Sequence, residues 1–341
     1  MFKRILAVLL CLMMLAMVAC QQKPDTLFSV AEDAAEAEAE SSSVVNPLTG
    51  LSDIDVKDVD NRPVAIMINN IKKAQAVQTA VNKADIIYET EVEGGLTRLM
   101  AVYKNLSEVG QIGSVRSARY PYVDLALGHD AVYVHCGQDP TYCAPHLKDI
   151  DDLSIDTRSK GAKRIPNGLS SEHTLYAFGD ELWESVTESF TDTTSTKKWQ
   201  KFADEDKKVT LDGGSANSIT VKFPASTTEF TYDSASGLYT RCSGGKAMLD
   251  YKTSEKTQVK NVFVLLTSIT DYPDGVHRKV ALEGGDGYYM TNGTKAFIKW
   301  TKGASTNAIK FTDTDGNPIE ISAGKSWICI VDKHTTQPTI E

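Results

Sequence analysis

From residue 219 to the C-terminus, short apolar runs alternate with turns rich in Gly, Asn and Asp. The runs read ITVKF, GLYTR, NVFVLL, RKVAL, GYYM, KAFIKW and SWICIVD. Runs of this length and spacing are typical of antiparallel strands, and Asn292-Gly293 and Asp315-Gly316 are strong hairpin signals. The sequence therefore predicts a β-rich, mostly antiparallel C-terminal domain over residues 206–341.

The preceding part of the chain alternates short apolar strands with helical segments. Strands are expected over residues 64–68, 86–92, 96–103 and 131–135, and helices over 72–83 and 121–127. Pro121 fits the first turn of the second helix, where its missing N–H costs nothing. The alternation predicts a mixed α/β N-terminal domain over residues 46–205, joined to the next domain through the polar stretch 187–208. The fold class is thus expected to be α+β.

The segment from 85 to 119 concentrates charge. Glu89, Glu91 and Glu93 fall on alternate residues, and alternation places strand side chains on one face. A two-residue turn at Gly94-Gly95 would set Glu91 opposite Arg98, where they would form a cross-strand ion pair. The pattern predicts a polar site but does not define its chemistry.

Two more arginines, Arg116 and Arg119, precede the helix expected at Pro121. Arginines beside a helix start suit phosphate or carboxylate binding. Three interpretations remain: an ion-pair network with the glutamates, an anion- or sugar-binding site, and a catalytic or Ca²⁺/Mg²⁺ site built on the carboxylates. His173, beside Glu172, is a candidate general base, and the alternative is a solvent-exposed bystander.

The N-terminus carries a targeting signal. Lys3 and Arg4 precede an apolar run over residues 5–18, which is too short to span a membrane and is typical of a signal peptide. The segment LAMVAC resembles a bacterial lipobox, so residues 1–19 are expected to be removed and Cys20 to carry a lipid. The alternative is an ordinary cleaved signal without lipidation. The protein is expected at the outer face of the cytoplasmic membrane.

Residues 20–45 contain the run AEDAAEAEAESSS and few residues able to build a core. They are expected to form a solvated, in part helical tether. Removal of residues 1–19 takes away two positive charges and no acid, which moves the net charge from −9 to −11. Such an acidic chain gives no electrostatic basis for nucleic-acid binding.

Four cysteines remain after Cys20, at positions 136, 143, 242 and 329. Outside the cytoplasm they could form disulfides in three ways, or they could be buried thiols. Cys136 and Cys143, with histidines at 129, 135 and 146, could in principle bind zinc, but their spacing matches no standard site. No metal and no cofactor is expected, because nucleotide-binding and catalytic motifs are missing from the sequence. Aromatic residues of the C-terminal half, among them Tyr239, Tyr272, Tyr289 and Trp300, could line a sugar-binding face or fill the core.

Several segments resemble the YerB-like lipoprotein family of Gram-positive bacteria, a family of unknown function. They are NPLTGL (46–51), RPVAIMINN (62–70), ADIIYETEVEGGLTR (84–98), IGSVRSAR (112–119), SEHTLYA (171–177), residues 275–282 and AGKSWICIVD (323–332). The resemblance implies a two-part architecture, with an α/β part followed by a β-rich part. It supplies no catalytic residues.

Three functional hypotheses follow. The first is a lipid-anchored envelope protein that binds an anionic or glycan cell-wall ligand through the Arg/Glu cluster and His173. The second is a carboxylate- or metal-assisted hydrolase or transferase acting on cell-wall polymer at the same site. The third is a structural lipoprotein whose β domain docks an envelope protein, and an exposed strand edge or apolar patch would favour it.

Overall fold

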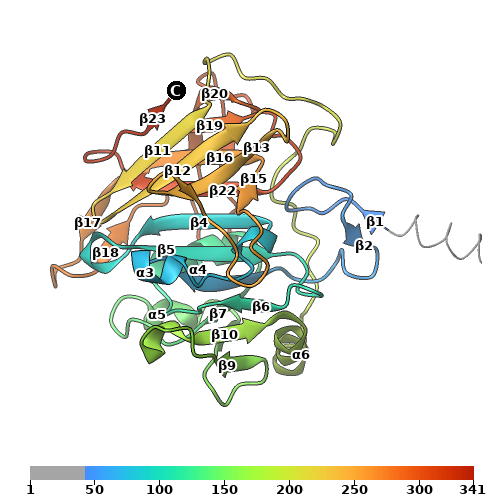
Figure 1. Ribbon diagram of the computed structural model, residues 1–341, viewed down its shortest axis with the longest axis vertical. Helices are drawn as coiled ribbons and strands as arrows, with labels where there is room; N and C mark the ends of the chain where they lie inside the picture. The colour runs from blue at the N-terminus through green and yellow to red at the C-terminus, as the bar shows by residue number, and fades with distance from the viewer. Residues whose placement is uncertain (1–42) are drawn as a thin grey trace, which may run out of the picture. The chain divides into compact units, whose positions relative to one another are not determined.

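A ten-stranded sheet passes through both halves of the chain (Figure 1). The computed structural model describes residues 43–341, so the predicted signal peptide, Cys20 and the tether up to residue 42 lie outside the described residues. The strand order is β21-β20-β19-β16-β22-β4-β5-β3-β7-β8. The strands of the C-terminal half are β16 (Asn261–Thr267), β19 (Gly284–Thr291), β20 (Thr294–Thr301), β21 (Lys310–Thr312) and β22 (Ser326–Asp332). The others are β3 (Val64–Asn69), β4 (Ile86–Glu91), β5 (Thr97–Tyr103), β7 (Val132–His135) and β8 (Asp152–Ser154).

The two halves join through β22, which pairs in parallel with β4 on one side and with β16 on the other. Every residue of β22 is buried. Its sequence, SWICIVD, has no alternation of polar and apolar residues, as is typical of a strand covered on both faces. Strands from both predicted domains thus belong to one sheet.

Smaller sheets lie around the large one. A six-stranded sheet contains β11 (Ser218–Phe223), β12 (Ser226–Asp233), β13 (Leu238–Ser243), β14 (Lys246–Ala247), β15 (Gln258–Val259) and β23 (Thr339–Ile340). A three-stranded sheet contains β6 (Gln111–Gly113), β9 (Ala162–Arg164) and β10 (Leu175–Phe178). The hairpin of β17 (Ile269–Asp271) and β18 (Arg278–Val280) forms a separate two-stranded sheet, and so do β1 (Ser43–Val44) and β2 (Ile54–Asp55).

Between residues 43 and 341 helices are few and short. They are α3 (Lys72–Gln75), α4 (Tyr120–Gly128), α5 (Ala144–Leu147) and α6 (Gly179–Ser189), with single 3₁₀ turns at η1 (Val81–Lys83), η2 (Glu93–Gly95) and η3 (Ser171–His173). Strand accounts for 39% of the described residues and helix for 12%. The α+β class expected from the sequence is confirmed only in part, because the described chain is mostly strand and helices contribute less than that class implies. None of the helices between residues 43 and 341 is long and apolar enough to cross a bilayer.

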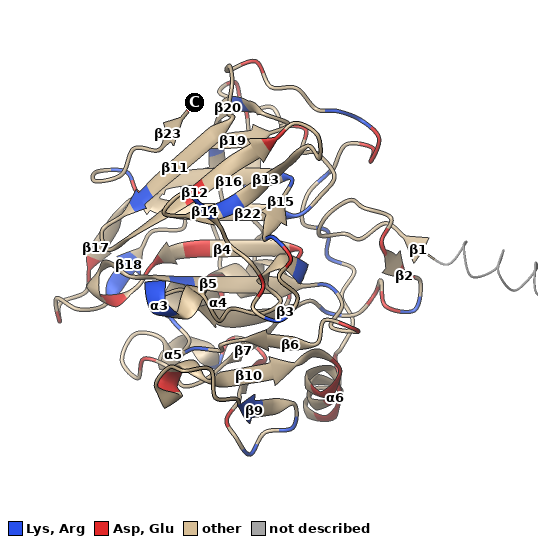
Figure 2. Cartoon of the chain, in the orientation of Figure 1, with Lys and Arg blue, Asp and Glu red and all other residues tan. Residues whose placement is uncertain are grey.

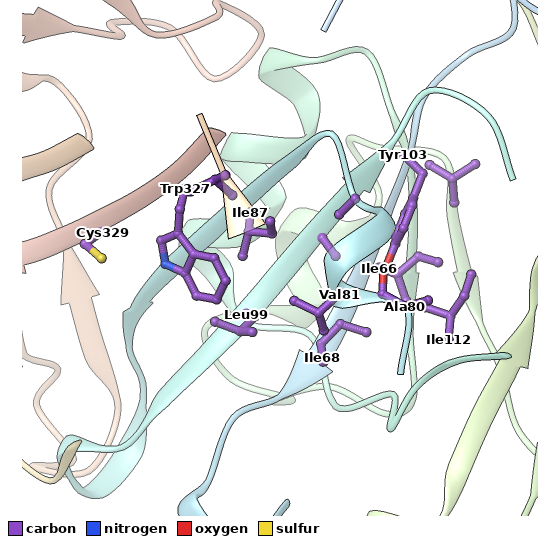
Figure 3. Packing of buried hydrophobic residues seen from close by; sticks show 14 of the residues in the cluster. Ile66, Ile68, Ala80, Val81, Ile87, Leu99, Tyr103, Ile112, Trp327 and Cys329 are labelled. Carbon is purple, nitrogen blue, oxygen red and sulfur yellow. Dashed lines mark hydrogen bonds between the residues drawn. The ribbon is translucent and has the colours of Figure 1, made fainter. Parts of the chain in front are cut away.

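The core has two layers, one on each face of the large sheet. On one face, Ile66, Ile68, Ile87, Leu99 and Trp327 belong to one layer of buried side chains (Figure 3). This layer lies under the six-stranded sheet, the three-stranded sheet and α6. On the other face, alternate residues of the same strands pack against α4 and residues 199–211. A buried large apolar side chain contributes about 1.5–3 kcal/mol, so these two layers supply most of the driving force for folding.

Two local predictions are wrong. The helix expected over residues 72–83 ends at Gln75, and Ala80 has φ of 60° before the separate turn η1. The turn after β4 has three residues, because η2 spans Glu93–Gly95 and Leu96 O accepts the Val92 N–H. That extra residue shifts the register, so Arg98 faces Thr90 and Glu91 faces Thr97. The predicted Glu91–Arg98 pair does not form.

Candidate functional site

The three acidic residues of the β4 segment lie in three different environments. In Figure 2 the acidic positions of β4 are coloured red at the middle of the molecule. Glu89 and Glu91 share a strand face, whereas Glu93 follows the end of the strand and belongs to η2. The alternation seen in the sequence therefore predicts the placement of two acids and fails for the third.

Glu89 is completely buried in a hydrogen-bond network. Its carboxylate accepts hydrogen bonds from Asn70 Nδ2 at 2.8 Å, Thr97 Oγ1 at 2.9 Å, Thr228 Oγ1 at 2.9 Å and Trp327 Nε1 at 3.1 Å. Donors from both halves of the chain replace the water that the charge has lost. Glu89 is thus a structural group that holds β12 and β22 against β4.

Glu91 is also buried, but it has a cationic partner. Arg278 Nη2 of β18 lies 3.1 Å from Glu91 Oε2. Burial raises the pKa of Glu91, and the charge of Arg278 opposes that rise. A cavity of about 390 Å³ beside the pair is also lined by Lys222 and Asp332.

Glu93 is the half-buried acid, and it lies between two arginines. It forms an ion pair with Arg119, and Arg98 Nη2 lies 4.0 Å from its other oxygen. Burial favours the neutral acid, but the hydrogen bond and charge of Arg119, together with Arg98, outweigh it and lower the pKa of Glu93. Arg98 itself is buried, and desolvation lowers its pKa to about 10. Of the three predicted arginines, Arg98 and Arg119 therefore meet at Glu93.

His277, which was not predicted as a site residue, completes this group from the β17–β18 loop. Its Nδ1 lies 2.6 Å from Asp274 Oδ2, and its Nε2 lies 3.3 Å from Asp139 Oδ1 and 3.4 Å from Glu93 Oε1. The Asp139 carboxylate in turn accepts backbone N–H groups of residues 141, 142 and 143. We call Glu93, Arg119, Asp139, Asp274 and His277 the Glu93 cluster.

An aromatic pair stands beside the Glu93 cluster. Tyr142 and Tyr272 stack with ring centroids 3.8 Å apart and an interplanar angle of 15°, and the Tyr142 ring lies 5.5 Å from that of His277. Both tyrosines are half-buried. By contrast, Tyr239, Tyr289 and Trp300 are buried. Of these four residues considered in the sequence analysis for a sugar-binding face, Tyr272 is therefore the one that lies beside the polar cluster.

Arg116 and His173 form a separate group. Arg116 Nη1 donates to the Glu172 carbonyl oxygen at 2.8 Å, and Glu172 Oε2 lies 3.6 Å away. His173 is buried rather than solvent-exposed, which corrects the bystander interpretation. Its Nδ1 accepts a hydrogen bond from Asn69 Nδ2 at 2.8 Å, Glu172 Oε1 lies 3.2 Å from Nε2, and burial lowers its pKa.

Both halves of the chain match family models of known proteins. Residues 48–194 match the family described as "Protein of unknown function (DUF3048) N-terminal domain", and residues 219–328 match "Protein of unknown function (DUF3048) C-terminal domain". The chain belongs to the DUF3048 family. It is 29% identical over 335 residues to "Putative lipoprotein YerB" of Bacillus subtilis, a match that covers 94% of this chain and 93% of that protein.

The fold is similar to that of a solved structure. The crystal structure of YerB protein from Bacillus subtilis superposes with a TM-score of 0.73 at 26% identity, covering 87% of this chain and 99% of that chain. The resemblance to YerB-like lipoproteins predicted from the sequence motifs is confirmed. So is the two-part organisation, because separate N- and C-terminal family domains match.

The cysteines and histidines of this DUF3048 protein have no shared site within residues 43–341. All four cysteines of this range are free thiols, and no group of three or more potential metal ligands lies together there. The histidine nitrogens have other partners. His129 Nε2 is 2.7 Å from Tyr88 Oη, and His135 bonds to Gly137 O and to Asp152 Oδ2.

Proposed function

We propose that this chain is a lipid-anchored cell-envelope protein that binds a cell-wall glycan. In this proposal residues 1–19 are removed, Cys20 carries the lipid at the outer face of the cytoplasmic membrane, and residues 20–45 tether the body. The lipobox-like segment LAMVAC supports this placement. So does the similarity to a protein that is itself named as a lipoprotein.

The Glu93 cluster beside the stacked tyrosines carries the proposal for the ligand. The exposed fractions of Glu93, Arg119, His277 and Asp274 side chains range from 18% to 34%, so solvent reaches them. Aromatic rings present an apolar face to a sugar ring, while carboxylates and arginine fix its hydroxyl groups. Such a combination of an aromatic wall and a few convergent polar groups is typical of a carbohydrate site.

The charge balance of the cluster favours a hydroxyl-rich ligand over a polyanion. Glu93 is neutralised by Arg119, and Asp274 is paired with His277. Arg98 and Arg116, which were predicted to bind an anion, donate instead to the backbone carbonyls of Ser117 and Glu172. Little positive charge therefore remains there for an anionic group.

Calorimetric titration of the full chain in detergent with peptidoglycan fragments and with neutral chitooligosaccharides tests the proposal. We expect saturable binding that Tyr272→Ala and Arg119→Gln weaken at least about tenfold, since each removes a direct contact. Arg158→Gln is the matched control, because Arg158 is 89% exposed and pairs only with its neighbour Asp156. Equal affinity in all variants would exclude this site, and loss of binding only together with loss of thermal stability would assign the cluster a structural role.

Chromatography of the ligand after the titration tests the enzymatic alternative. The Asp274–His277 pair has the arrangement of an oriented general base, so cleavage that His277→Gln abolishes would indicate a hydrolase or transferase.

Mass spectrometry of the mature N-terminus tests whether Cys20 carries the lipid. Membrane fractionation of Cys20→Ser tests the anchor itself, because this variant should be released from the membrane. A mature chain that starts elsewhere would contradict the lipid anchor.

A further inference from the structure

A second, larger cavity lies away from the Glu93 cluster. Its volume is about 960 Å³, and its wall combines η1, residues 205–208, the β12–β13 hairpin, the β15–β16 segment and the loop before β22. Both halves of the chain contribute to it. Volumes of roughly 300–1,000 Å³ are typical of small-molecule sites.

The wall of this cavity is basic, although the chain carries a net charge of −9. Six lysines and three acids line it. The lysines are Lys83, Lys207, Lys208, Lys256, Lys260 and Lys325, and the acids are Glu205, Asp206 and Glu255. The lysines outnumber the acids, and a concave wall with an excess of positive charge concentrates anions.

Three of the six lysines are already engaged, two of them with carboxylate partners. Lys83 Nζ lies 3.3 Å from Glu255, and Lys207 Nζ lies 2.7 Å from Glu320. Lys325 donates to Asn82 O at 2.7 Å and is balanced by the nearby charge of Asp85. These three lysines support the wall but contribute little free positive charge.

Lys208 and Lys260 are different, because they repel each other. Burial, and then the positive charge of Lys208, lower the pKa of Lys260. The Lys260 ammonium contacts the carbonyl oxygen of Gly237 at 3.3 Å, and neither lysine has a carboxylate within 4 Å among residues 43–341. Two like charges held at one wall are unfavourable, and an anion between them would remove that cost.

Lysine side chains are suited to phosphate groups. A lysine ammonium is a compact point charge with three donors on a flexible stem, and lysine is a common phosphate-binding residue. Lys256 stands exposed on the same wall as Lys208 and Lys260. Three mobile ammonium groups around a cavity of this volume suit more than one phosphate.

We propose that this lysine-lined cavity binds a ligand that carries two or more phosphate groups. Lys208 and Lys260 hold the phosphates, and Lys256 contacts the ligand at the rim. The ligand class is a pyrophosphate or a set of neighbouring phosphodiesters, whether free in solution or displayed as adjacent lipid headgroups. This site is independent of the glycan site, so either proposal can fail without the other.

The test is a calorimetric titration of the full chain in detergent with sodium pyrophosphate, repeated at increasing NaCl. We expect saturable binding that salt weakens, and a loss of affinity of about tenfold or more in Lys208→Gln/Lys260→Gln. Lys246→Gln/Lys310→Gln is the control, because it removes the same charge from exposed positions that do not line the cavity. We expect its affinity to stay within about twofold of wild type.

A second variant tests the site independently of the double substitution, and a second probe tests the source of the phosphate. Lys256→Glu changes an exposed residue, so it should fold and should also weaken binding. Flotation with phosphatidylcholine vesicles that contain or lack phosphatidylglycerol, using chain that lacks the lipid (Cys20→Ser), identifies the source. Lysine-dependent binding to pyrophosphate supports a soluble ligand, and lysine-dependent binding to phosphatidylglycerol vesicles supports a lipid headgroup. Binding to neither, or binding that all three lysine substitutions leave unchanged, overturns the proposal.

Discussion

Arg278 neutralises Glu91 from the other half of the chain, with Arg278 Nη2 and Glu91 Oε2 3.1 Å apart. Glu91 is 2% exposed, and its second oxygen has no hydrogen-bond partner within residues 43–341. Removal of one partner of a buried pair leaves the other charge uncompensated. The β17–β18 hairpin therefore contributes to stability as well as to the Glu93 cluster.

Arg278→Gln should lower the free energy of unfolding at pH 7 by about 2–3 kcal/mol, because Glu91 would remain buried without a cation. Urea unfolding measures the loss. It should shrink towards pH 4, since burial already raises the pKa of Glu91 and the neutral acid needs no partner. Arg158→Gln, at an exposed pair, should change stability by less than about 0.5 kcal/mol. A loss that does not depend on pH would contradict the assignment.

Glu89→Ala should be more damaging. It would leave the donors on Asn70, Thr97, Thr228 and Trp327 without their acceptor in a closed interior. Each orphaned buried donor costs about 1–3 kcal/mol, so we expect a loss of at least about 3 kcal/mol in urea unfolding. Glu188→Ala, on the solvent side of α6 with a 63% exposed side chain, is the control. A loss below about 1 kcal/mol would mean that water replaces the carboxylate.

The four thiols differ in accessibility, which alkylation under native conditions can measure. Cys136 is half-buried, whereas Cys143, Cys242 and Cys329 are buried. Burial raises the pKa of Cys136, of Cys329 and of Cys143, the last to about 12. Only thiolates react with iodoacetamide, and the reagent must also reach them. Peptide mapping should find Cys136 modified first and the other three protected until the protein unfolds. Disulfide-linked peptides in the native protein would contradict this expectation.

The strands were predictable and their partners were not. Apolar runs such as those of β3, β16 and β22 identify strands because burial leaves a local pattern. Hydrogen-bond and ion-pair partners leave no such pattern. Thr228 and Trp327 meet Glu89, and Arg278 meets Glu91, across more than a hundred residues of chain. The ion-pair interpretation therefore holds for Glu93, named the wrong partner for Glu91, and fails for Glu89, whose partners are neutral donors.

Glu93 leaves the strand face because of the length of the turn that follows β4, and the sequence alone does not reveal that length. A two-residue turn was the simplest interpretation of Gly94-Gly95. The actual turn has three residues, with both glycines at positive φ, and it directs Glu93 towards Arg119. His277 was missed because its loop carries no motif, and only the packing of β17 and β18 brings it to Glu93.

Asp85 should make stability depend on pH. Burial raises its pKa from 3.8 to about 6, although the Lys104 N–H and the charge of Lys325 oppose the rise. The folded state therefore holds a proton between about pH 4 and 6 that the unfolded state has lost. This contribution to the free energy of unfolding is fully present below pH 3.8. It is lost as the pH rises through 6, by about 3 kcal/mol in total.

Urea unfolding from pH 4 to pH 7 should show that difference between wild type and Asp85→Asn. The control Asp286→Asn, at an exposed strand position, should follow wild type. Parallel curves for Asp85→Asn and wild type would contradict the shift.

Gly94 and Gly95 offer a matched pair of substitutions in the turn that positions Glu93. Their φ values are 67° and 68°, so alanine at either position has a similar backbone cost of about 1 kcal/mol. The spaces around them differ. A Cβ on Gly94 would meet no atom within 4 Å, whereas one on Gly95 would lie 2.6 Å from Pro224 Cβ in the β11–β12 turn. Gly95 O also accepts the Ala225 N–H at 3.0 Å.

Gly95→Ala should therefore push the two turns apart and destabilise the protein by at least about 1 kcal/mol more than Gly94→Ala does. It should also weaken glycan binding, because Glu93 moves with its turn. Equal losses of stability in the two variants would mean that the β11–β12 turn yields freely, and that Glu93 is positioned by Arg119 rather than by the packing of these turns.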